Sequence, residues 1–253
     1  MVSHADMRSS LGDAVAGGDP GLSVADRLCL ACVRLLEVDG AAISVMVEGS
    51  SQGTVGSSGE LSRRLDELQF TFGEGPCMDA VHRGAPVIAE NLADPGEQRW
   101  PAYTGSALDL GVQAVYALPI RLANSVVGAL DLYRHNPGPL QGDSRLGGFM
   151  AAELAVLPVL GLLTDGADLL DISDGEKAWG QLTSLARVEV YQATGMVMAQ
   201  LGVGPAEALV RLRAHAFASG LTASEVAWEI VGRQLSLESD RERPDPGRTG
   251  GAA

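Results

Sequence analysis

The sequence predicts an α+β domain, with an antiparallel sheet flanked by helices, over residues 21–163, followed by an all-α domain of three helices over residues 177–237. In the first domain, helical apolar spacing alternates with runs rich in β-branched residues, in the order helix, strand, strand, helix, strand, helix, strand, strand, helix. Residues 164–176 are acidic, contain two glycines and predict a linker. Beyond them, the apolar spacing indicates helices alone.

The termini and the individual elements follow from local pattern. Residues 1–20 are small, polar and glycine-rich, and residues 238–253 are charged with proline and glycine, so we expect both to be disordered. The predicted strands are Ala41–Val47, Gln52–Ser57, Pro86–Glu90, Val112–Arg121 and Ser125–Arg134, the last two forming a hairpin. The predicted helices are Gly21–Val38, Leu61–Phe70, Met78–His82, Ala102–Leu110 and Phe149–Leu163, the last one kinked by Pro158.

In the C-terminal domain, Gly202-Val203-Gly204 and Ser219-Gly220 separate the three predicted helices. Pro205 suits a first helical turn, and Thr222 to Glu225 has capping-box spacing. The candidate core residues of this domain are Leu185, Val188, Val197, Leu201, Ala208, Leu209, Leu212, Phe217, Val226 and Ile230.

Composition excludes several classes of protein. The chain has 253 residues, a mean hydropathy of +0.12 and 46% hydrophobic residues, which excludes wholesale disorder. Its net charge of −14 argues against nonspecific duplex binding by the whole chain. The charge is uneven: residues 1–175 carry 10 basic and 23 acidic residues, whereas residues 176–235 carry five of each. A polyanion would therefore meet least repulsion at the C-terminal helices.

We expect a cytoplasmic protein without a membrane segment. The N-terminal sequence lacks a secretory pattern, and the most apolar stretch, Phe149–Leu163, is too short to span a bilayer. Three cysteines form no even disulfide framework, which is typical of a reducing compartment. The four histidines are scattered without metal-ligand spacing, and neither G-x-S-x-G nor GK[ST] occurs, so we expect no enzyme, no catalytic residue, no cofactor and no metal site.

Three segments of the first domain carry a family resemblance: Leu65–Cys77 (LDELQFTFGEGPC), Arg99–Tyr103 (RWPAY) and Gly128–Tyr133 (GALDLY). Together they resemble the GAF sensor domains of actinobacterial regulators. The C-terminal helices are similar to the ANTAR domain, the RNA-binding module of transcription antitermination regulators. Its pattern positions are occupied by Arg187, Val190, Ala193, Gly195, Met198, Gly202, Glu207, Ala208, Leu212, Ala216, Phe217, Val226 and Ala227.

The resemblance implies a signal-responsive regulator that binds, as a homodimer, hairpins in nascent RNA and so controls transcription termination. Arg187, Tyr191 and Gly195 are spaced by four, which predicts one helix face for RNA. Arg211, Arg213 and His215 lie within five residues of each other and add phosphate or base contacts. Ala193 and Thr194 complete the predicted RNA site, with Thr194 standing where the family commonly has lysine.

The sensor signal, a small molecule or an oxidant, is left open. Phe72, Cys77, Trp100, Tyr103 and Tyr116 are candidate ligand-binding residues, with core packing as the alternative for each. Cys77 precedes a predicted helix, so a lowered pKa and redox sensing form a second hypothesis. Cys29 and Cys32 lie inside an amphipathic helix and are expected in the core. A protein–protein interaction module without RNA binding is the remaining alternative.

Overall fold

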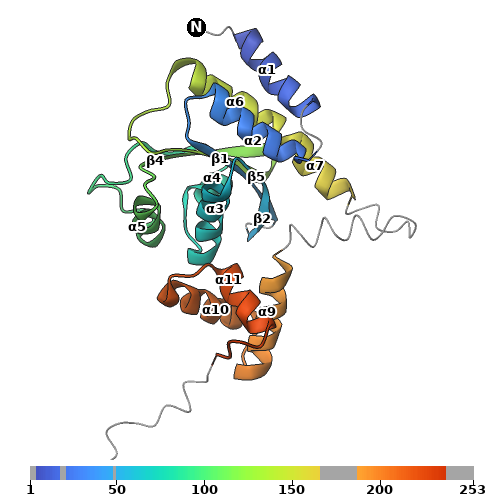
Figure 1. Ribbon diagram of the computed structural model, residues 1–253, viewed down its shortest axis with the longest axis vertical. Helices are drawn as coiled ribbons and strands as arrows, with labels where there is room; N and C mark the ends of the chain where they lie inside the picture. Colours follow the sequence, from blue (N-terminus) through green and yellow to red (C-terminus); the bar gives the residue numbers. More distant parts are fainter. Residues whose placement is uncertain (1–3, 18–20, 48–49, 166–186, 238–253) are drawn as a thin grey trace, which may run out of the picture. The chain divides into compact units, whose positions relative to one another are not determined.

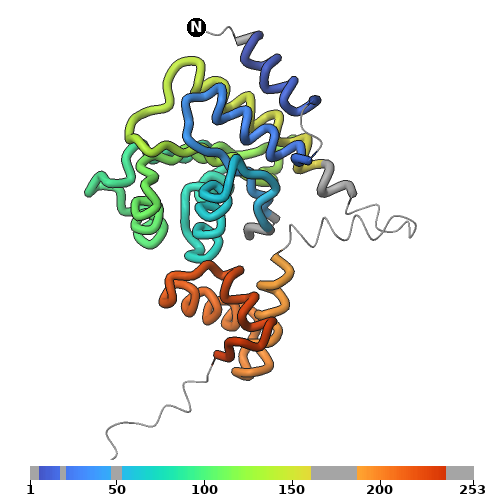
Figure 2. Tube along the Cα trace, viewed as in Figure 1, coloured from blue at the N-terminus to red at the C-terminus, as the bar shows by residue number. Residues whose placement is uncertain are grey.

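The computed structural model describes residues 4–17, 21–47, 50–165 and 187–237. The predicted linker beyond residue 165 and the predicted C-terminal tail, residues 238–253, lie outside this range. The chain divides into two compact units, Met1–Val188 and Glu189–Ala253, which are described separately. Figures 1 and 2 show the course of the chain.

The first unit contains a five-stranded antiparallel sheet in the order β2-β1-β5-β4-β3, which confirms the predicted fold class. The strands are β1 Gly40–Val47, β2 Ser50–Ser57, β3 Val87–Ala89, β4 Ala114–Leu122 and β5 Ser125–Arg134. The predicted hairpin joins β4 to β5, where Leu122 pairs with Ser125.

Helices cover both faces of this sheet (Figure 1). One face carries α2 Val24–Leu35 and α6 Gly142–Leu154, with α1 His4–Ala16 and α7 Val156–Asp165 beside them; the other carries α3 Glu60–Phe72, α4 Pro76–Arg83 and α5 Pro101–Asp109. Side chains alternate along a strand, so Tyr116 and Leu118 enter the core under α2 and α6, whereas Val115 and Ala117 enter the other core. The sheet is therefore buried on both sides.

The structure differs from the prediction of disorder in residues 1–20, because His4–Ala16 forms helix α1. Met7 and Leu11 are buried in the core beneath α2 and α6. The prediction relied on the polar composition of the segment as a whole. Met7 and Leu11 are four positions apart, so they lie on one face of the helix and pack that face against the domain.

The predicted kink at Pro158 is a break into two helices. Helix α6 ends at Leu154 and α7 begins at Val156. A proline has no N–H and its ring clashes with the carbonyl four residues earlier, which here is that of Leu154. The helix therefore stops where Pro158 forbids its continuation.

The second unit contains α9 Val188–Leu201 from Glu189 onward, α10 Pro205–Ser219 and α11 Ala223–Val231. The predicted capping box is present, because Thr222 Oγ1 accepts from Glu225 N and Glu225 Oε2 accepts from Thr222 N. Its buried apolar residues come from all three helices: Val190, Ala193, Val197, Ala208, Leu212, Ala216, Ala223, Val226, Ala227 and Ile230.

Two core predictions for this unit are wrong, because Val188 and Phe217 are exposed. On α10 the buried positions are Ala208, Leu212 and Ala216, and Phe217 lies about 100° further round the helix than Ala216. Leu201 and Leu209 are half-buried, and Leu185 lies outside the described residues. No helix in the described ranges is long and apolar enough to cross a membrane.

Candidate functional site

The loop between α3 and α4 organises the polar interior of the first unit. Helix α3 ends at Gly73, whose φ of 69° is left-handed, and Gly75 has a φ of 149°. A Cβ atom on Gly75 would lie 2.4 Å from Gln69 Oε1, so no larger residue fits there. Pro76 then occupies the first turn of α4. This turn brings the next residue, Cys77, back against α3.

Two side chains fix this loop. Gln69 Oε1 accepts from Cys77 N at 2.8 Å, and Gln69 Nε2 donates to Asp131 Oδ2 at 2.6 Å. Glu74 Oε1 accepts from the backbone N–H groups of Ala102 and Tyr103, at 2.7 and 3.1 Å. Because these N–H groups lie in the first turn of α5, Glu74 satisfies donors that have no partner within that helix. The motif that resembled a sensor family thus has a structural role.

A buried polar cluster lies between the sheet and this loop. Asp66 on α3 accepts from Ser44 Oγ on β1 and, at 2.5 Å, from Thr54 Oγ1 on β2. Asp131 on β5 and Cys77 on α4 complete it, and Asp66, Cys77 and Asp131 are all buried. Each offers a ligand atom, and the three atoms lie within 4.8 Å of one another.

Burial governs the ionisation of this cluster. Burial raises the pKa of Asp131 to about 7; the hydrogen bond from Gln69 opposes this shift, and the nearby Asp66 carboxylate adds to it. Burial also raises the pKa of the Cys77 thiol well above its ordinary value, and the neighbouring Asp131 and Asp66 add to the shift. The lowered Cys77 pKa on which the redox hypothesis depended is therefore wrong for this geometry, since a buried thiol among carboxylates stays protonated.

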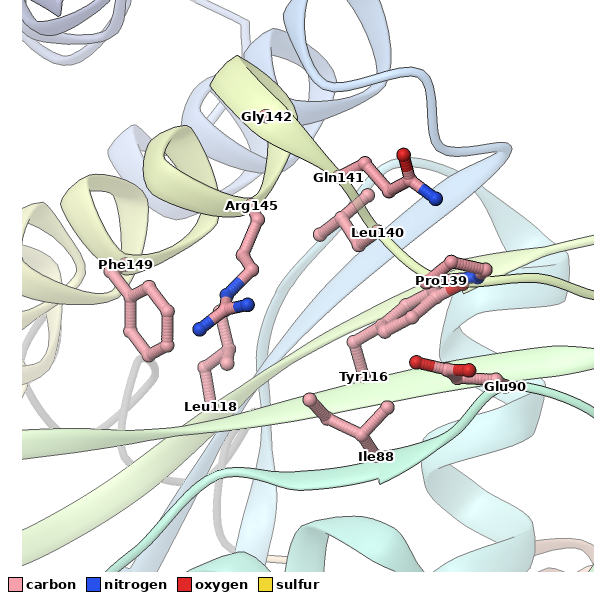
Figure 3. A pocket seen from close by; sticks show the side chains of 10 residues that line it. All are labelled: Ile88, Glu90, Tyr116, Leu118, Pro139, Leu140, Gln141, Gly142, Arg145 and Phe149. Atoms are coloured by element: carbon pink, nitrogen blue, oxygen red, sulfur yellow. The ribbon is translucent and has the colours of Figure 1, made fainter.

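The five predicted ligand-binding residues do not converge on one site. Cys77, Trp100 and Tyr103 are buried on the α3–α5 side of the sheet, with Phe72 half-buried beside them, whereas Tyr116 points to the opposite side. An open pocket of about 310 Å³ lies on that opposite side, between the sheet and α6 (Figure 3). Tyr116, Glu90, Arg145 and Phe149 are among its lining residues.

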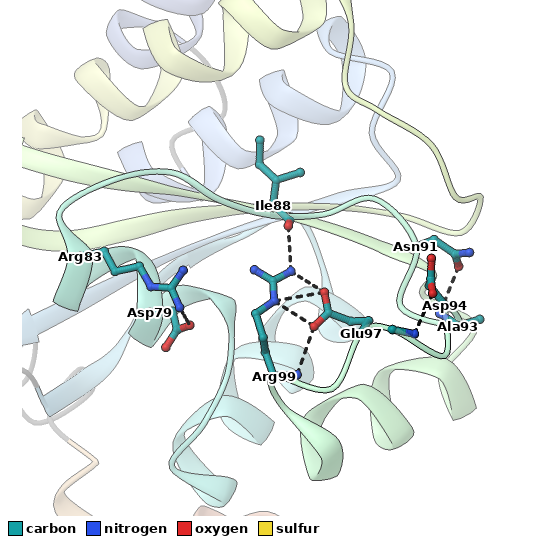
Figure 4. Close-up of polar contacts among 9 residues, drawn as sticks. Asp79, Arg83, Ile88, Asn91, Ala93, Asp94, Glu97 and Arg99 are labelled. Carbon is teal, nitrogen blue, oxygen red and sulfur yellow. Dashed lines mark hydrogen bonds and ion pairs between the residues drawn. The ribbon is translucent and has the colours of Figure 1, made fainter.

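Arg99 and Trp100, from the second segment of the resemblance, hold the loop between β3 and α5 (Figure 4). Arg99 Nε donates to Glu97 Oε1 at 2.8 Å, and Arg99 Nη2 donates to the Ile88 carbonyl at 2.9 Å. The Arg99 guanidinium also lies 4.2 Å from the centroid of the Trp100 ring. These contacts fix the course of the loop.

The predicted RNA-binding residues of α9 separate into exposed and buried groups. Tyr191 and Gly195 are exposed, and a Cβ atom on Gly195 would meet no atom within 4 Å. Ala193 and Thr194 are buried, with Thr194 Oγ1 donating to the Val190 carbonyl at 2.6 Å. The hydroxyl at the family's lysine position is therefore used within the helix.

Arg187 lies in the first unit and is 5% exposed. Its guanidinium approaches Asp66 Oδ2 and Glu67 Oε1, both at 3.4 Å, and lies 3.9 Å from the centroid of the Phe70 ring. The structure therefore does not bring Arg187 onto an exposed face with Tyr191 and Gly195.

On α10, Arg211, Arg213 and His215 are all partly exposed. Arg211 forms an ion pair with Glu207 at 3.0 Å. Four residues separate Arg211 from His215, so they share a flank, whereas two residues separate Arg211 from Arg213, which puts them about 200° apart. The three side chains therefore flank the helix on two sides rather than forming one patch.

Sequence reasoning missed the most exposed apolar residues of this unit. Val210, Phe217 and Trp228 are 62%, 60% and 64% exposed. The burial period of α11, with Ala223, Val226, Ala227 and Ile230 inside, places Trp228 opposite the core. That period was readable from the sequence once the helix boundaries were known.

Comparison with known proteins gives two family matches. A GAF domain model matches residues 23–157, and an ANTAR domain model matches residues 180–231. A comparison with curated protein sequences found no match.

Among solved structures, this chain is similar to a GAF domain from an Acinetobacter phosphoenolpyruvate-protein phosphotransferase, with 11% identity and a TM-score of 0.48, over 63% of this chain and 94% of that one. It is also similar to a domain of a sensor histidine kinase from Sinorhizobium meliloti 1021 (18% identity, TM-score 0.42, 54% and 89% covered). A third is a type II free methionine-R-sulfoxide reductase from Thermoplasma acidophilum (17% identity, TM-score 0.39, 53% and 91% covered).

Proposed function

Because this chain belongs to the GAF domain family and carries an ANTAR domain after it, we propose that it is a signal-responsive regulator that controls transcription termination by binding hairpins in nascent RNA. The observation that carries the proposal is the match of an RNA-binding antiterminator module to residues 180–231. GAF and ANTAR domains are regulatory rather than catalytic, so we expect sensing and binding without turnover.

The exposed surface of the second unit supports RNA binding. Tyr191 and Trp228 are 57% and 64% exposed, and an aromatic face can stack on the unpaired bases of an RNA loop. Gly195 follows Tyr191 by one helical turn and has open space above it, which lets an RNA backbone come close. Arg211, Arg213 and His215 on α10 supply donors for phosphate.

Regulation would work by a shift of population. A signal bound by the GAF domain acts only if it binds more tightly to one arrangement of the protein than to another. In the favoured arrangement, paired ANTAR domains hold a hairpin that competes with the terminator stem. The signal itself is unassigned by this proposal.

A homodimer is part of the proposal, and α6 and α7 offer a surface for it. Leu146 and Phe149 on α6 and Leu157 on α7 are 37%, 38% and 56% exposed, although all three are large and apolar. Their spacing continues across the break at Ala155, as expected of a stripe that packs against a second copy of the same helices.

The experiment begins with crosslinking of the full chain to cellular RNA and sequencing of what is bound. We expect enrichment of leader hairpins that lie next to terminators. The affinity for one enriched hairpin and for a scrambled strand of the same length is then measured at moderate ionic strength. If crosslinking recovers only background RNA, or if the hairpin and the scrambled strand bind with equal affinity, the proposal is contradicted.

Variants at two positions of α9, Gly195 and Tyr191, separate RNA contact from folding. Gly195→Ala removes a helix-destabilising glycine and meets no neighbouring atom, so it should stabilise the helix by about 0.5–1 kcal/mol. We nevertheless expect it to weaken hairpin binding. Tyr191→Ala should weaken binding about tenfold, since loss of base stacking costs roughly 1–3 kcal/mol, while Tyr191→Phe keeps the ring and binds nearly as the wild type.

The matched control is Gly204→Ala, at another described glycine of this unit that has open space around it and a negative φ. If Gly195→Ala and Tyr191→Ala bind the hairpin as Gly204→Ala does, α9 is not the RNA surface. If no variant or wild-type protein selects a hairpin, the exposed Val210 and Phe217 on α10 favour the alternative of a protein-binding module.

A further inference from the structure

The proposed RNA contacts use none of the buried residues Asp66, Cys77 and Asp131. Their ligand atoms come from α3, α4 and β5 and lie within 4.8 Å of one another. Asp131 is 4% exposed, and its Oδ2 atom is held by Gln69. Within the described part of the chain, its Oδ1 atom has no hydrogen-bond partner. A buried polar atom without a partner is rare and calls for a ligand or another explanation.

Among the described residues, Asp66 has a cationic neighbour, whereas Asp131 is held by a neutral amide. Ser44 and Thr54 donate to Asp66, and the Arg187 guanidinium lies 3.4 Å from its Oδ2 atom. Asp131 receives one neutral donor, from Gln69. Keeping two carboxylates and a thiol close together out of water is costly unless a cation or protons neutralise them.

We propose that Asp66, Cys77 and Asp131 bind one divalent transition-metal ion, with one position of the ion left open to a further ligand. Thiolate selects zinc, iron or cobalt over magnesium and calcium, and three protein ligands are typical of sites that keep an open position. Metal–sulfur bonds of about 2.3 Å and metal–oxygen bonds of about 2.0–2.2 Å place an ion within reach of all three atoms after a small contraction of the cluster.

The partners of the three ligands suit this role. Ser44 and Thr54 orient Asp66, and Gln69 orients Asp131 while its other end fixes the backbone of Cys77. Hydrogen bonds of this kind, made to the ligand residues rather than to the ion, hold the ligands in place before the ion binds. On binding, the ion replaces the proton on Cys77 Sγ and any proton on the carboxyls, and these protons pass to the buffer.

The sequence predicts no metal site, because its four histidines are scattered, without the short spacing to cysteine or aspartate that is typical of metal ligands. Here the ligands are 11 and 54 residues apart in the chain and meet through the turn at Gly73–Gly75 and through strand β5. The proposal stands on this geometry and does not depend on RNA binding.

The test uses the full chain, expressed with added Zn²⁺ or Co²⁺ and freed of loosely held metal. We expect one ion per chain, a thiolate-to-cobalt charge-transfer band in the near ultraviolet, and an X-ray absorption spectrum at the zinc edge with one sulfur donor and the rest oxygen. No bound ion, or a zinc shell without sulfur or with several sulfurs, would overturn the assignment. These measurements need no variant.

Variants then locate the site. Cys77→Ser and Asp131→Asn should weaken Zn²⁺ binding by more than about 100-fold. This loss exceeds the one expected when a residue that only hydrogen-bonds to a metal ligand is changed. Their controls are Cys32→Ala, a buried thiol in the core on the other side of the sheet, and Asp109→Asn, an exposed carboxylate. Both controls should bind within about twofold of wild type. Loss of binding in Cys32→Ala, or its retention in both ligand variants, would refute this site whatever the RNA experiments show.

Discussion

At the scale of single residues, Gln69 joins three parts of the sensor domain. Its side chain lies on α3, receives the backbone N–H at the start of α4 and donates to a carboxylate on the central strand β5. A glutamine has both a donor and an acceptor at one end, so it can satisfy two buried groups of opposite kind. The close approach of Gly75 to this side chain explains why the loop needs glycine there.

We predict that Gln69→Met destabilises the protein by about 2–6 kcal/mol. Methionine fills a similar volume but leaves the Cys77 N–H and Asp131 Oδ2 buried without their partner, at roughly 1–3 kcal/mol each. The free energy of unfolding by urea, followed by circular dichroism, measures this loss. The control Gln98→Met changes an exposed glutamine and should cost under about 0.5 kcal/mol. Equal losses of stability in the two variants would show that the hydrogen bonds of Gln69 do not stabilise the fold.

The sequence could identify some of these residues and not others. Cys77 and the glycines stood out because they lie in one short motif, and Tyr191 and Gly195 stood out because i, i+4 spacing marks a helix face. Asp66 and Asp131 join Cys77 through strand pairing and helix docking, which a linear pattern does not contain. Arg187 was placed by periodicity on an exposed face, whereas the acidic groups of Asp66 and Glu67 hold it in the interior.

At the scale of elements, most of the strands and helices follow from local sequence, but the predicted start at Phe149 was wrong, because α6 already begins at Gly142. All five strands and the capping box at Thr222 were predicted, because β-branched runs and capping residues act locally. Helix α1 was missed because its stability comes from Met7 and Leu11 packing against the domain rather than from propensity. The break before Pro158 was predicted in kind, since proline acts on its own helix.

The loop between β3 and α5 gives a prediction for acid stability. The hydrogen bond from Arg99 lowers the pKa of Glu97 below its ordinary value of 4.5. A carboxyl with a lower pKa in the folded state contributes stability that is present above the unfolded value and is lost as the pH falls through the folded one. We therefore expect Arg99→Met to destabilise the protein by about 1 kcal/mol at neutral pH, as for a partly exposed pair, and by less once Glu97 is protonated.

Thermal or urea unfolding of wild type and Arg99→Met, repeated from neutral pH to well below 4.5, measures this difference. The control is Arg83→Met, which removes a more exposed pair with Asp79 and should change stability by less than about 0.5 kcal/mol (Figure 4). A destabilisation by Arg99→Met that stays constant down to acid pH would assign the effect to the Trp100 ring contact or to the Ile88 carbonyl instead.

At the scale of the whole molecule, the two units differ in charge and in their polar groups. The first carries most of the negative charge and a buried polar cluster, whereas residues 176–235 carry equal numbers of basic and acidic residues. If the protein binds RNA as proposed, the acidic first unit would repel it and so favour contact at the ANTAR domain. The proposed RNA binding would gain affinity from a dimer, because a second contact within the same complex is favoured by its high effective concentration.

We therefore predict that dimerisation through α6 and α7 is required for tight hairpin binding. Leu157→Glu puts a charge at an exposed apolar position, where it costs the monomer little but is repelled by its own copy and desolvated in a symmetric interface. Analytical ultracentrifugation of the full chain should show a dimer for wild type and a monomer for this variant, with unchanged circular dichroism. Hairpin affinity should fall about tenfold or more with the loss of the second contact. The control His82→Glu puts the same charge at an exposed position of α4, on the other face of the sheet, and should leave the dimer intact. A wild-type chain that sediments as a monomer, or a Leu157→Glu variant that stays dimeric, would contradict the role of this stripe.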